Sequence, residues 1–287
     1  MSTAGGLTRA VERAVLHGCE TLQIFTKNNA QWAGRPIDVG QALQFRDAVT
    51  AAGLTPVVSH ASYLINMAAP EGELRRKSID AMADELERAR ALGLLGVVVH
   101  PGTAAAGQSE DNALALVADA IREVFSMRPD DGTMILVEHT AGQGRAVGHR
   151  FAHLAAIVDG ADRSDRIGVC LDTCHLLASG YDISSESGYA RAFDEFARLV
   201  GFARLRFLHA NDSKRPCGSR VDRHEHVGKG HVGLEAFRRL LHDSRLAHVG
   251  MAIETEKTPR VCNNPRVAQL DPLDRMNLEA LRTLRGR

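Results

Sequence analysis

Six short apolar runs of the sequence each end in a side chain that can bind a metal ion. These residues are His60, His100, Glu138, Asp172, His209 and Glu254. A lone histidine after a strand is usually a hydrogen-bonded loop residue, and an arginine can satisfy a single buried glutamate. Six coincident cases are poorly explained in this way. Because mixed imidazole and carboxylate ligands suit zinc or manganese better than magnesium, the runs predict a transition-metal site.

Two further motifs extend this set of candidate ligands. The string Asp172-Thr-Cys-His175 places a second imidazole about one helical turn after a strand end. The string Asp222-Arg-His224 puts two ligands on one side of an extended segment. With His175 they form a His₂Asp set, which is enough for a third metal ion with open positions. The alternative for Asp222 is an ion pair with Arg220 or Arg223.

The apolar runs that carry these residues are short and nearly continuous, as expected of parallel strands buried on both faces. The predicted strands are Thr21–Thr26, Thr55–His60, Gly96–His100, Met134–His139, Ile167–Asp172, Leu205–His209 and Met251–Glu254. Amphipathic helical segments lie between them. One of these segments ends at Gly93, a residue that suits a C-cap, and another begins after Ser109, which suits an N-cap.

Strands that alternate with helices predict an α/β fold, and their number predicts a TIM (β/α)₈ barrel. In such a barrel the carboxyl ends of all strands meet on one face, so the six strand-end residues would converge. One strand is lacking at the N-terminus, because the chain opens directly with Gly5, Gly6 and the first helix. We find no linker or sequence repeat, and we therefore predict a single domain over residues 1–287.

Composition limits the function only weakly. The formal net charge is zero, which neither supports DNA as a partner nor excludes it, because a local basic groove can occur on a neutral protein. Five cysteines without paired spacing and no signal peptide predict reduced thiols in a cytoplasmic protein. Cys170 and Cys174 are predicted to be packing residues, with a zinc pair as the alternative. The longest apolar run, Leu94–Val99, is too short to span a bilayer.

Six strings in the sequence resemble motifs of the endonuclease IV family of apurinic/apyrimidinic endonucleases. They are FTKNNAQW (Phe25–Trp32), HASYLIN (His60–Asn66), HPG (His100–Gly102), EHTAGQG (Glu138–Gly144), GVCLDTCH (Gly168–His175) and HANDSKRPCGSRVDRH (His209–His224). The resemblance runs from about Ser2 to the C-terminal helix, and the last two strings are highly specific.

The resemblance implies three zinc ions per chain, with manganese as an alternative at one site. His60 and His100 would hold the first ion, and Glu138 would bridge it to the second. Asp172, His209 and Glu254 would hold the second ion, and His175, Asp222 and His224 would hold the third. Glu138 and Glu254 would also orient the nucleophile.

The implied activity is DNA repair. A monomer would bind double-stranded DNA and cleave the phosphodiester bond 5′ to an abasic site, leaving a 3′-hydroxyl and a 5′-deoxyribose phosphate, by a multi-zinc hydroxide mechanism.

The resemblance also implies a set of DNA contacts. Tyr63 and Leu64 match residues that wedge into the duplex, and Gln31 and Trp32 match a second recognition loop. Ala30 departs from the family pattern, which often has arginine there. Arg223 and Lys229 lie in the ligand-bearing loop and could neutralise phosphates, although a solvated loop with scattered ion pairs is the alternative.

Two other functions remain open at this point. Sugar isomerases and epimerases use a related barrel with one or two metal ions, and a DNA-binding protein without nuclease activity would fit a barrel that lacks its first strand. We expect either that the coding region upstream holds a G-x-H-V-S-like strand, or that the chain is less stable and less active than its relatives. Removing one strand would expose the Thr21 and Met251 runs.

Overall fold

Among the residues that the structure describes, seven parallel strands form the centre of the molecule. The computed structural model describes residues 1–129, 132–162, 164–258 and 268–286. The strands of the sheet are β1 (Leu22–Ile24), β2 (Val57–His60), β3 (Gly96–Val99), β4 (Met134–Glu138), β5 (Ile167–Asp172), β6 (Leu205–His209) and β9 (Gly250–Ala252). Each strand pairs in parallel with the next one in this order. All seven predicted runs therefore contribute a strand, although several strands are shorter than predicted.

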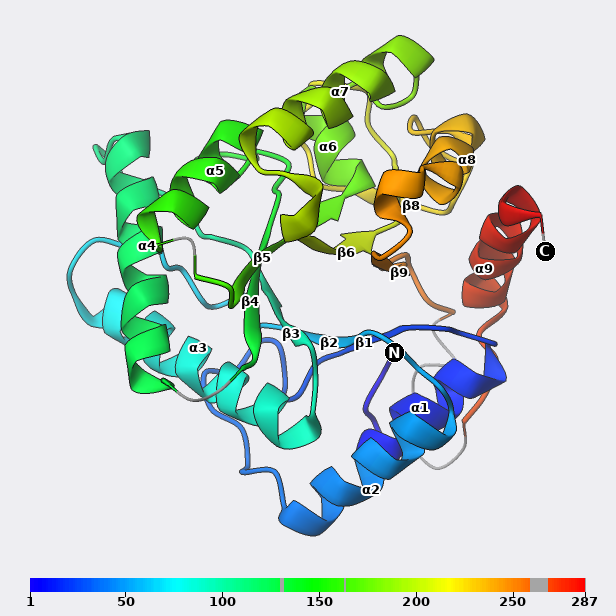
Figure 1. Ribbon diagram of the computed structural model, residues 1–287, viewed down its shortest axis with the longest axis horizontal. Helices are drawn as coiled ribbons and strands as arrows, with labels where there is room; N and C mark the ends of the chain where they lie inside the picture. The colour runs from blue at the N-terminus through cyan, green and yellow to red at the C-terminus, as the bar shows by residue number, and fades with distance from the viewer. Residues whose placement is uncertain (130–131, 163, 259–267, 287) are drawn as a thin grey trace.

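Helices surround the strands and cover the outer face of the sheet (Figure 1). They are α1 (Leu7–Leu16), α2 (Val39–Ala51), α3 (Glu73–Leu92), α4 (Glu110–Met127), α5 (Phe151–Gly160), α6 (Thr173–Ser179), α7 (Glu186–Leu199), α8 (Leu234–His242) and α9 (Pro272–Arg285), with short 3₁₀ segments η1 (Phe202–Arg204) and η2 (Ser244–Leu246).

Two of the predicted helix boundaries are set by the residues named above. The Ser109 side chain accepts a hydrogen bond from the backbone N–H of Asn112 and caps α4. Gly93 ends α3 with a φ of 68°, a left-handed conformation that glycine adopts without a steric penalty. In the part of the chain that the structure describes, no helix combines the length and apolar character needed to cross a membrane.

The core is divided between the two faces of the sheet. The larger part lies between the strands and the surrounding helices. The smaller part fills the interior of the barrel and consists of Val58, Val98, Met134, Leu136, Cys170 and Phe207. Alternate residues of a strand point to opposite faces, so the same strands supply both parts. The barrel interior is thus a packed core up to its carboxyl end, where the polar residues begin.

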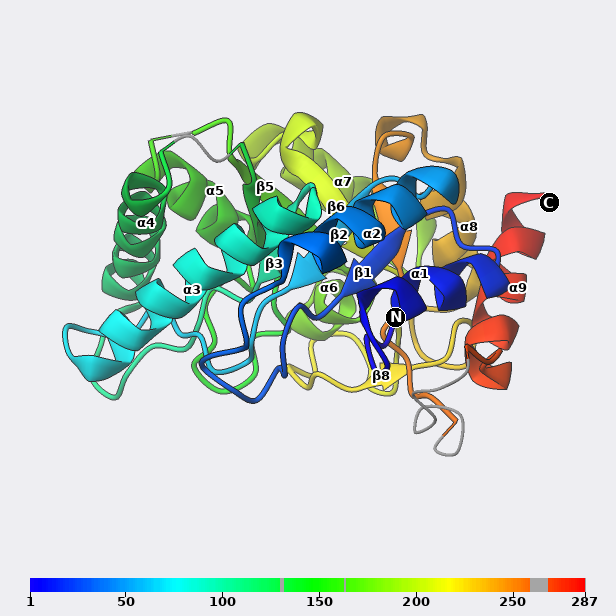
Figure 2. The ribbon, with the colours of Figure 1, turned by 90° about the horizontal axis from the view of Figure 1, so that it is seen from below.

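The barrel is open on one side. Strands β1 and β9 each have one neighbour in the sheet, and a cleft of about 1690 Å³ lies between them. The architecture is therefore that of a TIM barrel lacking one strand, as the sequence predicts. Helix α9 lies beside α1 on this side of the molecule (Figure 2), where the Arg282 guanidinium donates hydrogen bonds to the carbonyls of His17 and Gly18.

Candidate metal centre

The candidate ligands lie two residues beyond the packed interior of the barrel. Since alternate strand residues share a face, each position two places after an interior core residue also points inward. At the carboxyl ends of β2 to β6 these positions are His60, His100 (one residue after β3), Glu138, Asp172 and His209, which follow Val58, Val98, Leu136, Cys170 and Phe207. Glu254 likewise follows Ala252, which packs against the interior core. The period of the strand thus brings all six residues to one end of the barrel.

Glu138 lies at the centre of these residues and is fully buried. Its Oε2 atom is 3.1 Å from Nε2 of His60 and 3.1 Å from Nε2 of His100. Its Oε1 atom lies 3.0 Å from Nδ1 of His209. One carboxylate therefore contacts two groups of candidate ligands, one through each oxygen.

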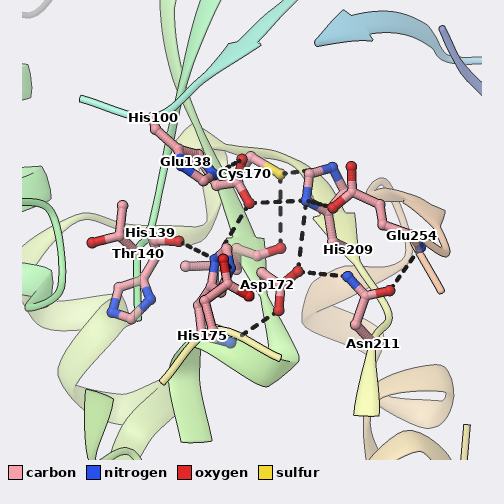
Figure 3. A network of polar contacts seen from close by, with 12 residues as sticks. His100, Glu138, His139, Thr140, Cys170, Asp172, His175, His209, Asn211 and Glu254 are labelled. Carbon is pink, nitrogen blue, oxygen red and sulfur yellow. Dashed lines mark hydrogen bonds and ion pairs between the residues drawn. The ribbon is translucent and has the colours of Figure 1, made fainter. Parts of the chain in front are cut away.

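The second group gathers around His209 (Figure 3). Its Nδ1 atom is 3.2 Å from Oε2 of Glu254 and 3.8 Å from Oδ2 of Asp172. With Glu138, these residues offer four ligand atoms that all lie within 4.8 Å of one another. The structure thus brings together Glu138, Asp172, His209 and Glu254, the four residues of the second ligand set.

The third group joins a strand end to a loop. The Oδ1 atom of Asp172 accepts a hydrogen bond of 2.9 Å from the backbone N–H of His175 and thereby caps α6. Nε2 of His175 is 3.2 Å from Oδ2 of Asp222, and Oδ1 of Asp222 is 3.3 Å from Nε2 of His224. The capping bond explains why the string from Asp172 to His175 delivers a second imidazole to the site.

A small antiparallel pair of strands carries the loop ligands. It consists of β7 (Asp212–Ser213) and β8 (His224–Glu225). The buried carboxylate of Asp212 accepts hydrogen bonds from the backbone N–H groups of Ser213, Gly228 and Val232. These bonds hold both ends of the loop that bears Asp222 and His224.

Asn211 is a buried residue to which the sequence analysis assigned no role. Its Nδ2 donates to Oδ2 of Asp172 over 2.6 Å, and its Oδ1 accepts from the backbone N–H of Glu254 over 2.7 Å. It thus fixes two candidate ligands from different strands. The sequence gives one indication of this role: the polar pair Asn211-Asp212 begins two residues after the strand-end histidine His209, and polar groups buried in that position need partners.

The charges of the ligands depend on one another. Burial by itself would raise the pKa of Glu138, but the imidazoles of His100 and His209 outweigh this effect and hold it well below its usual range. Burial would lower the pKa of His175, yet Asp172 and Asp222 raise it to about 10. The pKa of His224 rises to about 9 because Asp172 and Asp222 outweigh its burial as well. Without a cation, the imidazoles would carry the positive charge of this centre.

The hydrogen bonds of the third group fit a metal ion. Nδ1 of His175 donates to the carbonyl of His139 over 2.8 Å, and Nδ1 of His224 lies 3.3 Å from the carbonyl of Glu254. The Nε2 atoms of both residues are buried and have no hydrogen-bond partner, although carboxylate oxygens lie close by. The Nε2 atoms of His175 and His224 and the carboxylate of Asp222 are the ligands expected of a zinc site. In such sites the other ring nitrogen of each histidine makes the hydrogen bond that orients the ring.

The candidate DNA contacts lie around this centre. The Tyr63 side chain is exposed, and its backbone N–H donates to the carbonyl of Asn29, so its loop is joined to the loop of Gln31 and Trp32. Gln31 is exposed, whereas Leu64 and Trp32 are half-buried. Arg223 and Lys229 are both exposed on the loop that bears Asp222.

Several other residues with reactive side chains are buried. Cys170 and Cys174 are fully buried, in agreement with the packing role predicted for them, and Cys262 lies outside the described residues. His17, His149 and His153 are buried as well. His149 and His153 lie with Glu110 in a cluster that Arg150 also enters, donating to both His153 and Glu110.

The chain is similar to known proteins over nearly its whole length. Residues 11–282 match the family model of the xylose isomerase-like TIM barrels. Proteins named probable endonuclease 4 from Chloroflexus aurantiacus and Geobacter sp. strain M21 are 47% and 44% identical to it over 99% of this chain and 96% of theirs.

Solved structures give the same result. The crystal structure of endonuclease IV from Thermus thermophilus superposes with a TM-score of 0.84 at 35% identity, over 99% of this chain and 96% of that one. A D-tagatose 3-epimerase-like protein shares the fold alone, with a TM-score of 0.70 at 18% identity over 99% of this chain and 95% of that chain. The chain belongs to the endonuclease IV family.

Proposed function

We propose that this protein is a DNA-repair endonuclease that hydrolyses the phosphodiester bond 5′ to an abasic site, leaving a 3′-hydroxyl and a 5′-deoxyribose phosphate. The observation that carries the proposal is the position of Glu138, whose two oxygens each face a different group of ligands. A shared carboxylate between two metal sites is suited to phosphodiester cleavage, in which attacking and leaving oxygens both need stabilisation. Residues 1–287 would form one domain with this activity.

The residues present would hold three zinc ions, with manganese as an alternative at one of them. The first set is His60, His100 and Glu138; the second is Glu138, Asp172, His209 and Glu254; the third is His175, Asp222 and His224. When bound, such ions lower the pKa of water and act as Lewis acids towards phosphoryl oxygens.

Glu138 and Glu254 act on the nucleophile as well as on the metal ions. The pKa of Glu254 is lowered because the charge of His209 outweighs its burial, so the group is ionised at neutral pH. Its side chain is 21% exposed and adjoins the cleft beside β1 and β9. An ionised carboxylate in this position accepts a hydrogen bond from a water molecule and directs the oxygen lone pair towards the substrate phosphorus.

The loops around the centre recognise the DNA. Tyr63 and Leu64 enter the duplex, and Gln31 and Trp32 contact it from the adjoining loop. Extrusion of an abasic nucleotide costs less than flipping a normal one, because there is no base to unpair. Arg223 and Lys229 neutralise phosphates, and the protein acts as a monomer.

A nicking assay tests this function. We expect the zinc-loaded protein to cut a duplex with one abasic site and to leave the matching undamaged duplex intact. Glu138→Gln should abolish the cut, whereas Glu12→Gln, on the surface of α1, should leave it unchanged. Failure to cut, together with epimerisation of a ketose sugar, would overturn the proposal in favour of a sugar epimerase. Binding of the abasic duplex without cleavage would indicate a DNA-binding protein instead.

A further inference from the structure

The histidines of the metal centre are oriented in two different ways. Three of them place Nδ1 against a backbone carbonyl: His60 against that of Ala61, His175 against that of His139, and His224 against that of Glu254. In each case Nδ1 carries the proton and Nε2 faces a carboxylate of the centre. The backbone therefore sets the tautomer, and no side chain is needed for it.

His209 has the opposite orientation. Its Nδ1 atom faces Glu138 and Glu254, whereas its Nε2 atom lies 2.8 Å from Oε1 of Gln23. Gln23 lies on β1, 186 positions earlier in the sequence, and only 8% of its surface is exposed. Sγ of Cys170 lies 3.9 Å from the same nitrogen, so the groups that face Nε2 are side chains, and Gln23 is the nearer of the two.

The amide of Gln23 is itself fixed by a second contact. Its Nε2 donates to Oε1 of Glu254 over 2.7 Å. A carboxylate only accepts, so the amide nitrogen must face Glu254 and the amide oxygen must face His209. An amide oxygen also only accepts, which places the imidazole proton on Nε2 and leaves the lone pair of Nδ1 directed at the centre.

We propose that Gln23 is a positioning residue that locks His209 in the tautomer able to bind a metal ion through Nδ1, and at the same time holds the Glu254 carboxylate. The inference rests on the proposed function, because it concerns the second ligand set. Gln23 belongs to the interior face of β1, since Leu22 and Ile24 on either side pack into the outer core. A strand with only one neighbour in the sheet therefore supplies the residue that joins two ligands.

Loss of Gln23 should weaken one metal site selectively. Residues that orient a metal ligand change metal affinity by about 10- to 100-fold when they are substituted. Gln23→Met keeps the length of the side chain and removes both hydrogen bonds. Gln23→Glu keeps an acceptor for His209 and removes the donor to Glu254. Gln41→Met, on the exposed surface of α2, is the matched control.

Chelator competition and ¹⁵N NMR of labelled histidines test the inference on the zinc-loaded protein. We expect Gln23→Met to bind one of its zinc ions about 10- to 100-fold more weakly, with the other ions unchanged. The Nε2–H signal of His209 should be lost in Gln23→Met and kept in Gln23→Glu, and thermal unfolding without metal should show that both variants fold.

Wild-type zinc affinities in Gln23→Met, or a His209 signal that is the same in both variants and the wild type, would overturn the inference. If Gln23→Met does not fold, Gln23→Glu decides: loss of its Nε2–H signal would overturn the inference. Failure of the wild-type chain to bind zinc would overturn the proposed function instead, so the two failures are distinguishable.

Discussion

The metal centre has a buried part and an exposed part, and the protein holds them by different means. Glu138, Asp172 and His209 are 0% exposed and lie at the ends of strands that are paired on both sides. The side chains of Asp222 and His224 are 37% and 20% exposed; Asp222 lies on a loop, and His224 begins the short strand β8. The sheet fixes the first three residues, whereas the hydrogen bonds of Asp212 fix the loop.

This difference in burial indicates how strongly a substitution in each part of the centre should affect the metal sites. A buried carboxylate needs a partner, because removing its partner leaves an uncompensated charge away from water. Glu138 contacts both inner groups of ligands, so its replacement disturbs two sites at once. Asp222 is itself partly exposed to water and faces two imidazoles of a single ligand set, so its replacement disturbs one site only. The effects of substitutions should therefore decrease from the buried part to the exposed part and then to the DNA loops.

Replacement of the bridging carboxylate should have the largest effect. In Glu138→Gln, cleavage of an abasic duplex should fall by at least about 10³-fold, the upper end of the loss seen when one charge-stabilising group of an active site is removed. The far-UV circular dichroism spectrum should stay unchanged, because the amide has the shape of the carboxylate. Near-normal cleavage by this variant would contradict the bridging role of Glu138.

Replacement of the loop carboxylate should have a smaller effect. Asp222→Asn weakens the third set alone, so cleavage should fall by about 10- to 100-fold, on the scale of a weakened metal site. Asp47→Asn, on the exposed face of α2, should behave as the wild type in the same steady-state assay. A loss as large as that of Glu138→Gln would show that the two parts of the centre do not act separately.

The buried part of the site could be predicted from the sequence, because strand period and residue type act together there. A glutamate within Ile-Leu-Val-Glu138 or an aspartate closing Val-Cys-Leu-Asp172 stands out in an apolar run. The exposed part could not be predicted with equal certainty. The spacing of Asp222 and His224 indicates two ligands but does not exclude an ion pair of Asp222 with a neighbouring arginine, because the hydrogen bonds of Asp212 that fold the loop leave no periodic pattern in the sequence.

The side-chain contacts that join different strands could not be predicted from the sequence either. Gln23 and Asn211 each join residues from two elements, and neither has a spacing that indicates its partner. The fold was predicted more fully, since seven apolar runs and their helices specify a barrel with one strand lacking. The burial of His149 and His153 could not be predicted, because the periodicity of α5 does not reveal how the loop before it packs.

The stability of the metal-free protein should depend on pH in both directions. The pKa values of His175 and His224 are raised to about 10 and 9, so their stabilising contribution is complete below about pH 6.5 and is lost as the pH rises through these values. The pKa values of Glu138 and Asp222 are lowered, so their contribution is present above about pH 4.5 and is lost at lower pH.

Melting temperatures with and without zinc measure this effect. The metal-free protein should melt at a lower temperature at pH 8.5 than at pH 6. Zinc binding displaces protons from the imidazoles, so the rise in melting temperature on adding zinc should be larger at pH 8.5. A zinc-induced rise that is larger at pH 6 would contradict the assigned charges.

The smallest effect should come from the DNA loop. Ala30 is exposed beside Gln31, and Ala30→Arg should strengthen binding of an abasic duplex a few-fold through one added phosphate contact. The gain in affinity should decrease as the salt concentration rises. The slope of the logarithm of the binding constant against the logarithm of the salt concentration should steepen by about one. Ala30→Gln, which adds length without charge, should show no such salt dependence. Equal affinities of Ala30→Arg and wild type would show that this loop does not approach the DNA.

Native mass spectrometry of the zinc-loaded chain tests the central claim most directly, because it counts the metal ions in each variant. Three ligand sets, two of which share Glu138, predict three ions in the wild type, two in Asp222→Asn, and one, held by the third set, in Glu138→Gln. Fewer than two ions in the wild type, or as many ions in Glu138→Gln as in the wild type, would contradict a centre built around one bridging carboxylate.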